Sequence, residues 1–135
     1  MKLHNVNWIC TQNAAKLNEL GIVTTQDLLR YGKTVKRRAR LAQKLGVTRS
    51  KMLKWVHSAD LARVRGVGDD YVTMLHRANV HTLDDLAQQD AERLVDQFVS
   101  LNRMYHVVKR VPAPKSVSGW ISSAQDLPRL VSYEG

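Results

Sequence analysis

Apolar residues recur every three or four positions along most of the chain, which is the spacing of a helix with one buried face. Residues 33–46 show this most clearly, because strong helix formers there surround an apolar set made of Val35, Ala39, Leu41, Ala42 and Leu45. The same spacing predicts further helices at residues 49–56, 90–99, 102–108 and 114–126. We therefore expect an all-α protein, a compact bundle of short helices.

Short polar signals mark where several of these helices begin and end. Thr24 and Thr82 are each followed three residues later by an aspartate, which is the Thr-x-x-Asp form of a capping box. Gly21 and Asn79 precede these threonines by three residues, and both residue types tolerate the left-handed conformation that ends a helix. The Gly-Val-Thr sequence at residues 46–48 resembles the same corner. We expect short helices joined by nearly identical corners.

Residues 61–75 predict two helices joined by a tight turn. The turn is Gly66-Val67-Gly68, in which the two glycines permit backbone conformations closed to other residues and Val67 is expected to fill the junction. The backbone N–H groups where the second helix starts, near residues 68–71, are free to hold one phosphate of a nucleic acid. This is the pattern of a helix-hairpin-helix.

A displacement of 58 positions places this segment on the beginning of the chain. Val6 then falls on Val64, and the two capping boxes fall on each other. Trp8 and Cys10 stand where the second copy has its glycines. The first copy is therefore a degenerate hairpin in which Trp8 is expected to pack rather than to stack on a base.

The last helix follows a stiff connector, Pro112-Ala113-Pro114, and Pro114 suits the first helical position. Its apolar stripe is expected to clamp the helix onto the main body, with a partner-binding helix as the alternative. The predicted organisation is two pseudo-repeated helix-hairpin-helix units, at about residues 4–56 and 57–111, forming one domain over 1–111, with residues 112–135 packing on the same core.

Charge is distributed unevenly along the sequence. The net charge is +9, yet the stretch between Asp27 and Asp60 holds ten basic residues and no acidic one. Residues 60–96 hold eight acids and four bases, so that part is acidic. Clustered charge creates a field that binds polyanions, whereas interspersed charge only keeps a surface soluble.

Three of the ten basic residues, Arg37, Arg40 and Lys44, share one face of the helix at residues 33–46, at positions i, i+3 and i+7. Two solvated helix faces would explain this pattern in an average protein. Ten bases without one acid make a nucleic-acid-binding surface an equal alternative.

Composition excludes several other classes of protein. No apolar run approaches the roughly 18 residues needed to cross a bilayer, and residues 1–5 lack the apolar core of a signal peptide, so we expect a cytoplasmic protein with no membrane partner. Cys10 is the single cysteine, which excludes an internal disulfide and a cysteine-based metal cage. We expect Cys10 to be a small buried side chain.

The sequence carries no residue pattern typical of catalysis or of metal binding. The five histidines show no metal-ligand spacing, and His76 and His81, five positions apart, are expected to point in different directions. Base-flipping glycosylases that contain such a hairpin are larger than this chain. A Schiff-base lyase would need a lysine of lowered pKa in a pocket, for which crowding of Lys36 or Lys44 by other cations is the only hint. We expect no enzyme, no cofactor and no metal.

Five segments occur in an order that resembles a bacterial domain-of-unknown-function family of tandem helix-hairpin-helix proteins. They lie at residues 21–24, 34–42, 55–61, 66–68 and 120–128, and include Gly66-Val67-Gly68 and Trp120-Ile121. The resemblance covers nearly the whole chain and implies a fold but no established activity. The wider helix-hairpin-helix class implies sequence-independent DNA binding through hairpin amides that contact phosphates.

The chain departs from that class just after the second glycine of the hairpin. DNA-binding hairpins usually carry a small or basic residue there, whereas this chain has Asp69 and Asp70. A carboxylate at a helix start satisfies the free N–H groups itself and repels a phosphate. The basic helices are therefore expected to carry much of any affinity for nucleic acid.

The first functional hypothesis is a non-enzymatic protein that binds nucleic acid, DNA before RNA, largely without sequence preference. The candidate binding residues are Lys33, Lys36, Arg37, Arg38, Arg40, Lys44, Arg49, Lys51 and Lys54 on the basic helices, and Arg65, Gly66 and Gly68 at the hairpin. The alternative is a module for protein–protein interaction or self-association, in which the acidic part of one chain pairs with a basic part of another copy or of a different partner.

Overall fold

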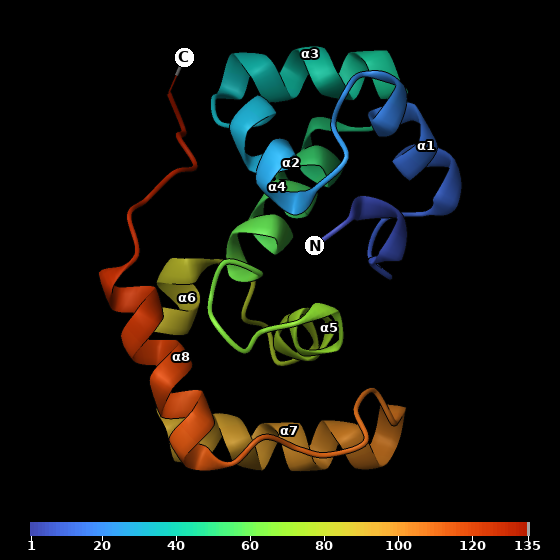
Figure 1. The fold of residues 1–135 in the computed structure, drawn as a ribbon. Coiled ribbons are helices and arrows are strands. Elements are labelled where there is room, and N and C mark those ends of the chain that lie inside the picture. The colour runs from blue at the N-terminus through green and yellow to red at the C-terminus, as the bar shows by residue number, and fades with distance from the viewer. Residues whose placement is uncertain (135) are drawn as a thin grey trace. The chain divides into compact units, whose positions relative to one another are not determined.

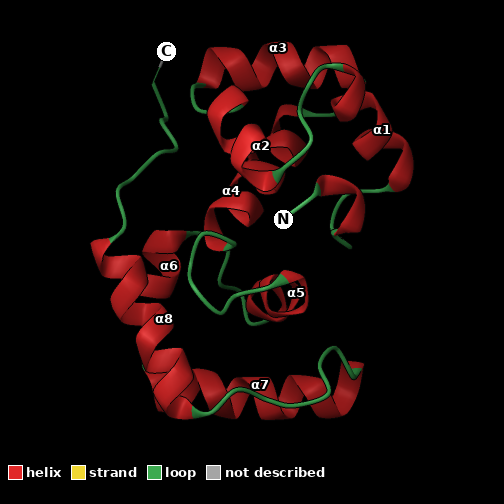
Figure 2. Ribbon diagram, viewed as in Figure 1, coloured by secondary structure: helices red, strands yellow, loops and turns green. Residues whose placement is uncertain are grey.

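The computed structural model describes residues 1–134, which are almost entirely helices and the turns between them (Figures 1 and 2). The only β geometry among these residues is an isolated bridge between Lys2 and Thr24. The prediction of an all-α protein is confirmed. The elements are the short 3-10 helix η1 (Leu3–Asn5) and the α-helices α1 (Thr11–Glu19), α2 (Thr25–Tyr31), α3 (Val35–Leu45), α4 (Arg49–Leu61), α5 (Asp69–Arg77), α6 (Leu83–Ala87), α7 (Ala91–Tyr105) and α8 (Pro114–Asp126).

The chain divides into two compact units. Unit 1 comprises Met1–Asp60 together with the tail that starts at Arg129, and unit 2 comprises Leu61–Pro128. The boundary at residues 60 and 61 lies close to the expected junction between the repeats at residues 56 and 57. The units do not follow the expected domain boundary at residue 111, because α8 belongs to unit 2 and the tail belongs to unit 1.

Unit 1 has its own apolar core. Leu17, Leu28 and Met52 are fully buried in it, and Trp8 is half-buried against it, so the expectation that Trp8 packs is confirmed. Helix α1 contacts both η1 and α3. The tail is tied to this unit by a hydrogen bond from the Ser132 N–H to the Lys33 carbonyl oxygen (2.8 Å), and the Tyr133 hydroxyl lies 3.1 Å from His57 Nε2.

Unit 2 is built around α8, which contacts both α6 and α7. The apolar stripe that the sequence predicts on α8, from Val117 to Ala124, is buried. Its central side chain is Trp120, whose ring centroid lies 5.1 Å from that of Tyr71 and 6.5 Å from that of Phe98. The expected clamp is therefore formed, and this face of α8 is occupied within unit 2.

The corners between helices have the geometry that the sequence predicts. Thr24 and Thr82 both form complete capping boxes with the aspartates three residues on. Gly21 and Asn79 both have positive φ angles, of 84° and 64°. Gly46 is also left-handed, and the Thr48 hydroxyl accepts a hydrogen bond from the Lys51 N–H at 3.0 Å. The third corner is therefore a helix end and a helix start of the same kind.

The displacement of 58 positions found in the sequence recurs in the structure. Helices α1 and α5 have the same length and begin 58 positions apart, at Thr11 and Asp69. After each helix, the backbone N–H of an apolar residue donates a hydrogen bond to the carbonyl oxygen of a leucine in that helix. The donor is Ile22 and the acceptor Leu17 after α1 (2.9 Å), and the donor is Val80 and the acceptor Leu75 after α5 (2.8 Å). Equivalent residues of the two segments therefore make equivalent backbone contacts.

Three local predictions are wrong. Asn102 does not start a helix of its own, because α7 continues through it to Tyr105 and ends at His106, which is left-handed at a φ angle of 50°. The Asn102 side chain instead bonds both the N–H and the carbonyl of Val108, each at 3.0 Å. Helix α4 continues past Val56 to Leu61. Cys10 is exposed rather than buried, since it flanks the start of α1 and the neighbouring Ile9 fills the core.

Candidate nucleic-acid interface

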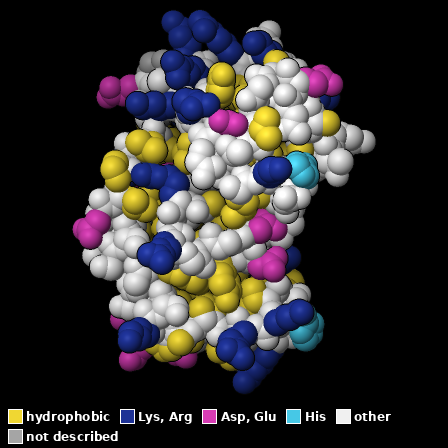
Figure 3. All heavy atoms as spheres, in the orientation of Figure 1, with side chains coloured by type: hydrophobic (Ala, Val, Ile, Leu, Met, Phe, Trp, Pro, Cys, Tyr) yellow, Lys and Arg dark blue, Asp and Glu magenta, His cyan; other side chains and the backbone are white. Residues whose placement is uncertain are grey.

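A basic groove lies on unit 1 where the end of α2 meets one face of α3. It has a volume of about 440 Å³ and is lined by Arg30, Tyr31, Arg37, Arg40, Leu41 and Lys44. The three cations predicted to form a stripe on α3 therefore do share one surface. Figure 3 shows Lys and Arg side chains gathered over the α3 edge of this unit.

The tight connection between α2 and α3 brings the two sides of this groove together. Helix α2 ends at Gly32, where a Cβ atom would lie 2.6 Å from Val56 Cγ2, so only glycine fits without rearrangement. Thr34, two residues later, caps the start of α3, and its hydroxyl accepts a hydrogen bond from the Arg37 N–H. Arg37 Nη1 donates to the Arg30 carbonyl oxygen at 3.1 Å, which places a cation at the carbonyl end of α2.

Most of the charge in this groove is not neutralised by the residues that the structure describes. Arg30 forms an ion pair with Asp27 at 2.8 Å, and the Arg30 side chain remains 69% exposed. The Asp27 carboxylate also accepts the N–H groups of Val23 and Thr24, which hold its pKa below the ordinary value. Among residues 1–134, Arg37, Arg40 and Lys44 have no carboxylate within ion-pair distance, so their positive field is directed at solvent.

Arg38 must be removed from the predicted binding residues. It is only 4% exposed and lies on the core face of α3 with Leu41, Ala42 and Leu45. Its guanidinium donates to the carbonyl oxygens of Gly32 (2.9 Å), Lys33 (3.0 Å) and Ser132 (2.6 Å). Burial lowers the pKa of Arg38 from its ordinary value. A position three residues before a buried leucine lies on the same face of the helix as that leucine. The Arg38 guanidinium is therefore buried and hydrogen-bonded to backbone carbonyls, and it does not face a ligand.

The remaining predicted cations of unit 1 are exposed but do not line the groove. They are Lys33, Lys36, Arg49, Lys51 and Lys54. Lys51 Nζ lies 5.9 Å from the centre of the buried Trp55 ring, which holds this ammonium close to α4. The structure therefore divides the predicted set into a clustered group on α2 and α3 and a group outside the groove.

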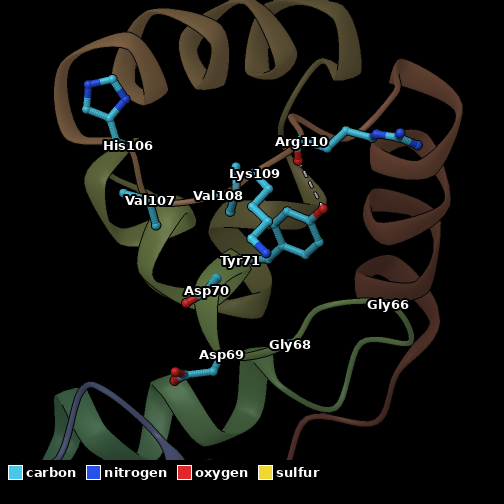
Figure 4. A pocket seen from close by; sticks show the side chains of 10 residues that line it. All are labelled: Gly66, Gly68, Asp69, Asp70, Tyr71, His106, Val107, Val108, Lys109 and Arg110. Atoms are coloured by element: carbon cyan, nitrogen blue, oxygen red, sulfur yellow. Dashed lines mark hydrogen bonds between the residues drawn. The ribbon is translucent and has the colours of Figure 1, made fainter.

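The predicted hairpin of unit 2 lines a separate depression, shown in Figure 4, together with Tyr71 and residues 106–110. Gly66 has a φ angle of +93°, and Val67 is buried as expected, with 3% of its surface exposed. Gly68 precedes α5 without a side-chain cap, so Asp69 and Asp70 supply negative charge in the first turn. In Figure 4 the Arg110 guanidinium points away from these carboxylates. Arg65, the third predicted hairpin residue, is exposed.

The sequence matches one known family model, described as Domain of unknown function (DUF4332), over residues 7–127. The chain belongs to the DUF4332 family. The match spans the helices of both units, and the family description carries no activity. Neither the curated proteins nor the solved structures contain a match to the chain.

Three groove residues of this DUF4332 chain were missing from the predicted binding residues: Arg30, Tyr31 and Leu41. Tyr31 stands beside Arg30 at the start of the basic stretch, and an aromatic residue next to basic ones was the available signal. Leu41 was assigned to the core, and it is indeed only 6% exposed, yet its edge also lines the groove. A residue that packs inward and also lines a shallow groove cannot be recognised from helical spacing alone.

The two neighbouring histidines of this DUF4332 chain lie differently from what their spacing suggests. His76 and His81 do not point apart, because the left-handed Asn79 reverses the chain between them. Their Nδ1 atoms are 2.7 Å apart and the two rings stack. Within residues 1–134, no three His, Cys, Asp or Glu side chains come together as metal ligands. No described helix is both long enough and apolar enough to cross a bilayer.

Proposed function

We propose that this protein binds nucleic acid, DNA in particular, without sequence preference and without catalysing a reaction. The observation that carries the proposal is the groove on unit 1, in which Arg37, Arg40 and Lys44 lie together with no carboxylate of the described chain beside them. A row of uncompensated cations along a helix neutralises phosphates and reads no base edges, so the affinity it provides is electrostatic.

The internal repeat of the chain supports the same proposal. We infer that the two segments related by 58 positions are tandem helix-hairpin-helix units. Their helices begin at equivalent positions, and the backbone hydrogen bonds that follow each helix join equivalent residues. The second hairpin, with Arg65, Gly66 and Gly68, is proposed as an additional backbone contact. Its contribution is smaller, since Asp69 and Asp70 at the start of α5 oppose an approaching phosphate.

Charge reversal of the α3 stripe tests this function. The variant R37E/R40E/K44E is compared with R93E/R103E/K115E, which changes the net charge by the same amount at three exposed cations of unit 2. We expect the first variant to lose its gel shift on duplex DNA and the second to retain it. The slope of log K against log salt should decrease in magnitude by about 2 to 3 for the α3 variant. Equal binding by both variants would refute the proposal.

The alternative of self-association has less support. Of the eight acids at residues 60–96, Asp60 is buried, and Asp85 and Asp90 serve as caps of α6 and α7. Asp70, Asp84, Asp90, Glu92 and Asp96 are exposed, although the Asp90 carboxylate also accepts a hydrogen bond as the cap of α7. The acidic surface available to a basic partner is therefore smaller than the sequence suggests.

A further inference from the structure

We propose that the groove on unit 1 binds an unpaired base as well as phosphates, so that the protein prefers single-stranded nucleic acid to duplex. This inference rests on the proposed function and narrows its substrate class. It depends on one feature that phosphate binding does not use, the aromatic ring of Tyr31 among the groove cations.

Tyr31 is presented to solvent by its place at the end of α2. Its side chain is the last of that helix, and it precedes the buried Gly32 at which the chain turns. Tyr31 is 45% exposed, and its hydroxyl takes part in no hydrogen bond within residues 1–134. A large ring that neither packs in the core nor bonds through its hydroxyl is available as a stacking surface.

The surroundings of the ring fit a nucleotide. The guanidinium carbon of Arg30 lies 5.6 Å from the ring centre of Tyr31, and bases stack on guanidinium planes as well as on aromatic rings. Leu41 adds apolar surface to the groove, while Arg37, Arg40 and Lys44 extend from the same groove along α3. A base on the ring and its neighbouring phosphates on the α3 cations would thus be bound by one continuous surface.

An unpaired strand can use both the ring and the cations of this surface, whereas a duplex can use only the cations. The bases of a duplex are stacked on their neighbours and expose only their edges, so a side-chain ring at the phosphate backbone has no base face to contact. A flexible single strand can turn a base outward while its phosphates remain on the cations. Stacking on a side-chain ring is tolerant of sequence because every base has a π-face, which agrees with binding without sequence preference.

The test measures fluorescence anisotropy with three labelled probes. They are an oligothymidylate of about ten nucleotides, which is within the usual site size of single-strand binders, an abasic strand of the same length, and a duplex of the same length. The variants are Tyr31→Ala and Tyr31→Phe. Tyr105→Ala is the matched control, because Tyr105 is also exposed and also has an arginine, Arg77, over its ring, but it lies in unit 2 outside the groove.

We expect Tyr31→Ala to weaken binding to the oligothymidylate by roughly 5- to 150-fold, which is the range for loss of one stacked base. Tyr31→Phe and Tyr105→Ala should retain it, and binding of the abasic strand and of duplex should be the same for all variants. Unchanged oligothymidylate binding by Tyr31→Ala, with R37E/R40E/K44E inactive, would overturn the single-strand inference and leave the proposed function standing. If R37E/R40E/K44E also binds normally, both fail. Melting curves of each variant confirm that a loss is not due to unfolding.

Discussion

Arg38 carries a positive charge into the core of unit 1, where one guanidinium serves three backbone carbonyls. Two of them, on Gly32 and Lys33, belong to the turn between α2 and α3, and the third belongs to Ser132 of the tail. Carbonyl groups at a helix end lack partners within the helix, and a buried group left without one is costly. A single side chain therefore joins three segments of the unit.

Removal of this donor should destabilise the protein strongly. We expect Arg38→Met, which keeps an unbranched apolar stem but none of the hydrogen-bond donors, to lower the free energy of unfolding by about 2 to 4 kcal/mol. Arg40→Met, at an exposed cation of the same helix, should change it by less than about 0.5 kcal/mol. Urea denaturation followed by circular dichroism measures both. Equal effects of the two substitutions would contradict the structural role of Arg38.

Asp27 should make the stability of the folded chain change with pH in the acid range. The N–H groups of Val23 and Thr24 lower its pKa in the folded chain, so the unfolded chain binds a proton more readily. The stabilising effect is complete above the unfolded pKa of about 3.9 and is lost as the pH falls through the folded value. We expect the stability difference between wild type and Asp27→Asn to be full at about pH 6 and to shrink below about pH 4.

Thermal melting across this pH range measures the Asp27 effect. Asp96→Asn removes one exposed charge from α7 and controls for the change in net charge. If the difference in stability between wild type and Asp27→Asn stays constant down to about pH 2, the folded chain does not stabilise the ionised form of Asp27.

At the scale of the helices, local signals decide most boundaries. Capping boxes and left-handed corners involve four or five neighbouring residues, so Thr24, Thr82 and Gly46 could be recognised from the sequence. The end of α7 could not, because Asn102 has the side chain of a helix cap yet uses it to bind Val108 six residues later. Only the folded loop shows which partner such a side chain takes.

The two glycines of the hairpin should respond differently to substitution. Gly66 has a φ angle of +93°, and an added Cβ would lie 3.0 Å from Trp120 Nε1, whereas Gly68 has a φ angle of −86° and open space around it. We expect Gly66→Ala to cost about 1 to 3 kcal/mol. Gly68→Ser should be neutral or slightly stabilising, by a few tenths of a kcal/mol, because serine caps a helix as well as or better than glycine. Chemical denaturation distinguishes them, and equal losses would contradict this geometry.

At the scale of the whole molecule, the sequence reveals that positive charge is concentrated but not which cations share a surface. Arg37 and Arg38 are adjacent in the sequence, yet one lines the groove and the other is buried. The difference depends on which face of α3 meets the core, and the buried face includes a charged residue that hydrophobic spacing assigns to solvent. Tyr31 belongs to a different helix and joins the groove only through the fold.

The oligomeric state should not depend on salt. Because three of the eight acids at residues 60–96 are buried or act as caps, we expect no charge-driven association between copies of the chain. Light scattering at about 50 mM and about 500 mM salt, where screening differs strongly, should give the same mass. A larger mass at low salt that falls on addition of salt would favour the self-association alternative.

The tail of unit 1 has a consequence for biosynthesis. The carbonyl that Arg38 contacts at 2.6 Å belongs to Ser132, whereas Arg38 itself is made almost a hundred residues earlier. During translation, all of unit 2 leaves the ribosome before this oxygen does. The buried guanidinium of the earlier-made part of unit 1 can therefore gain its third acceptor only after all of unit 2 has been made.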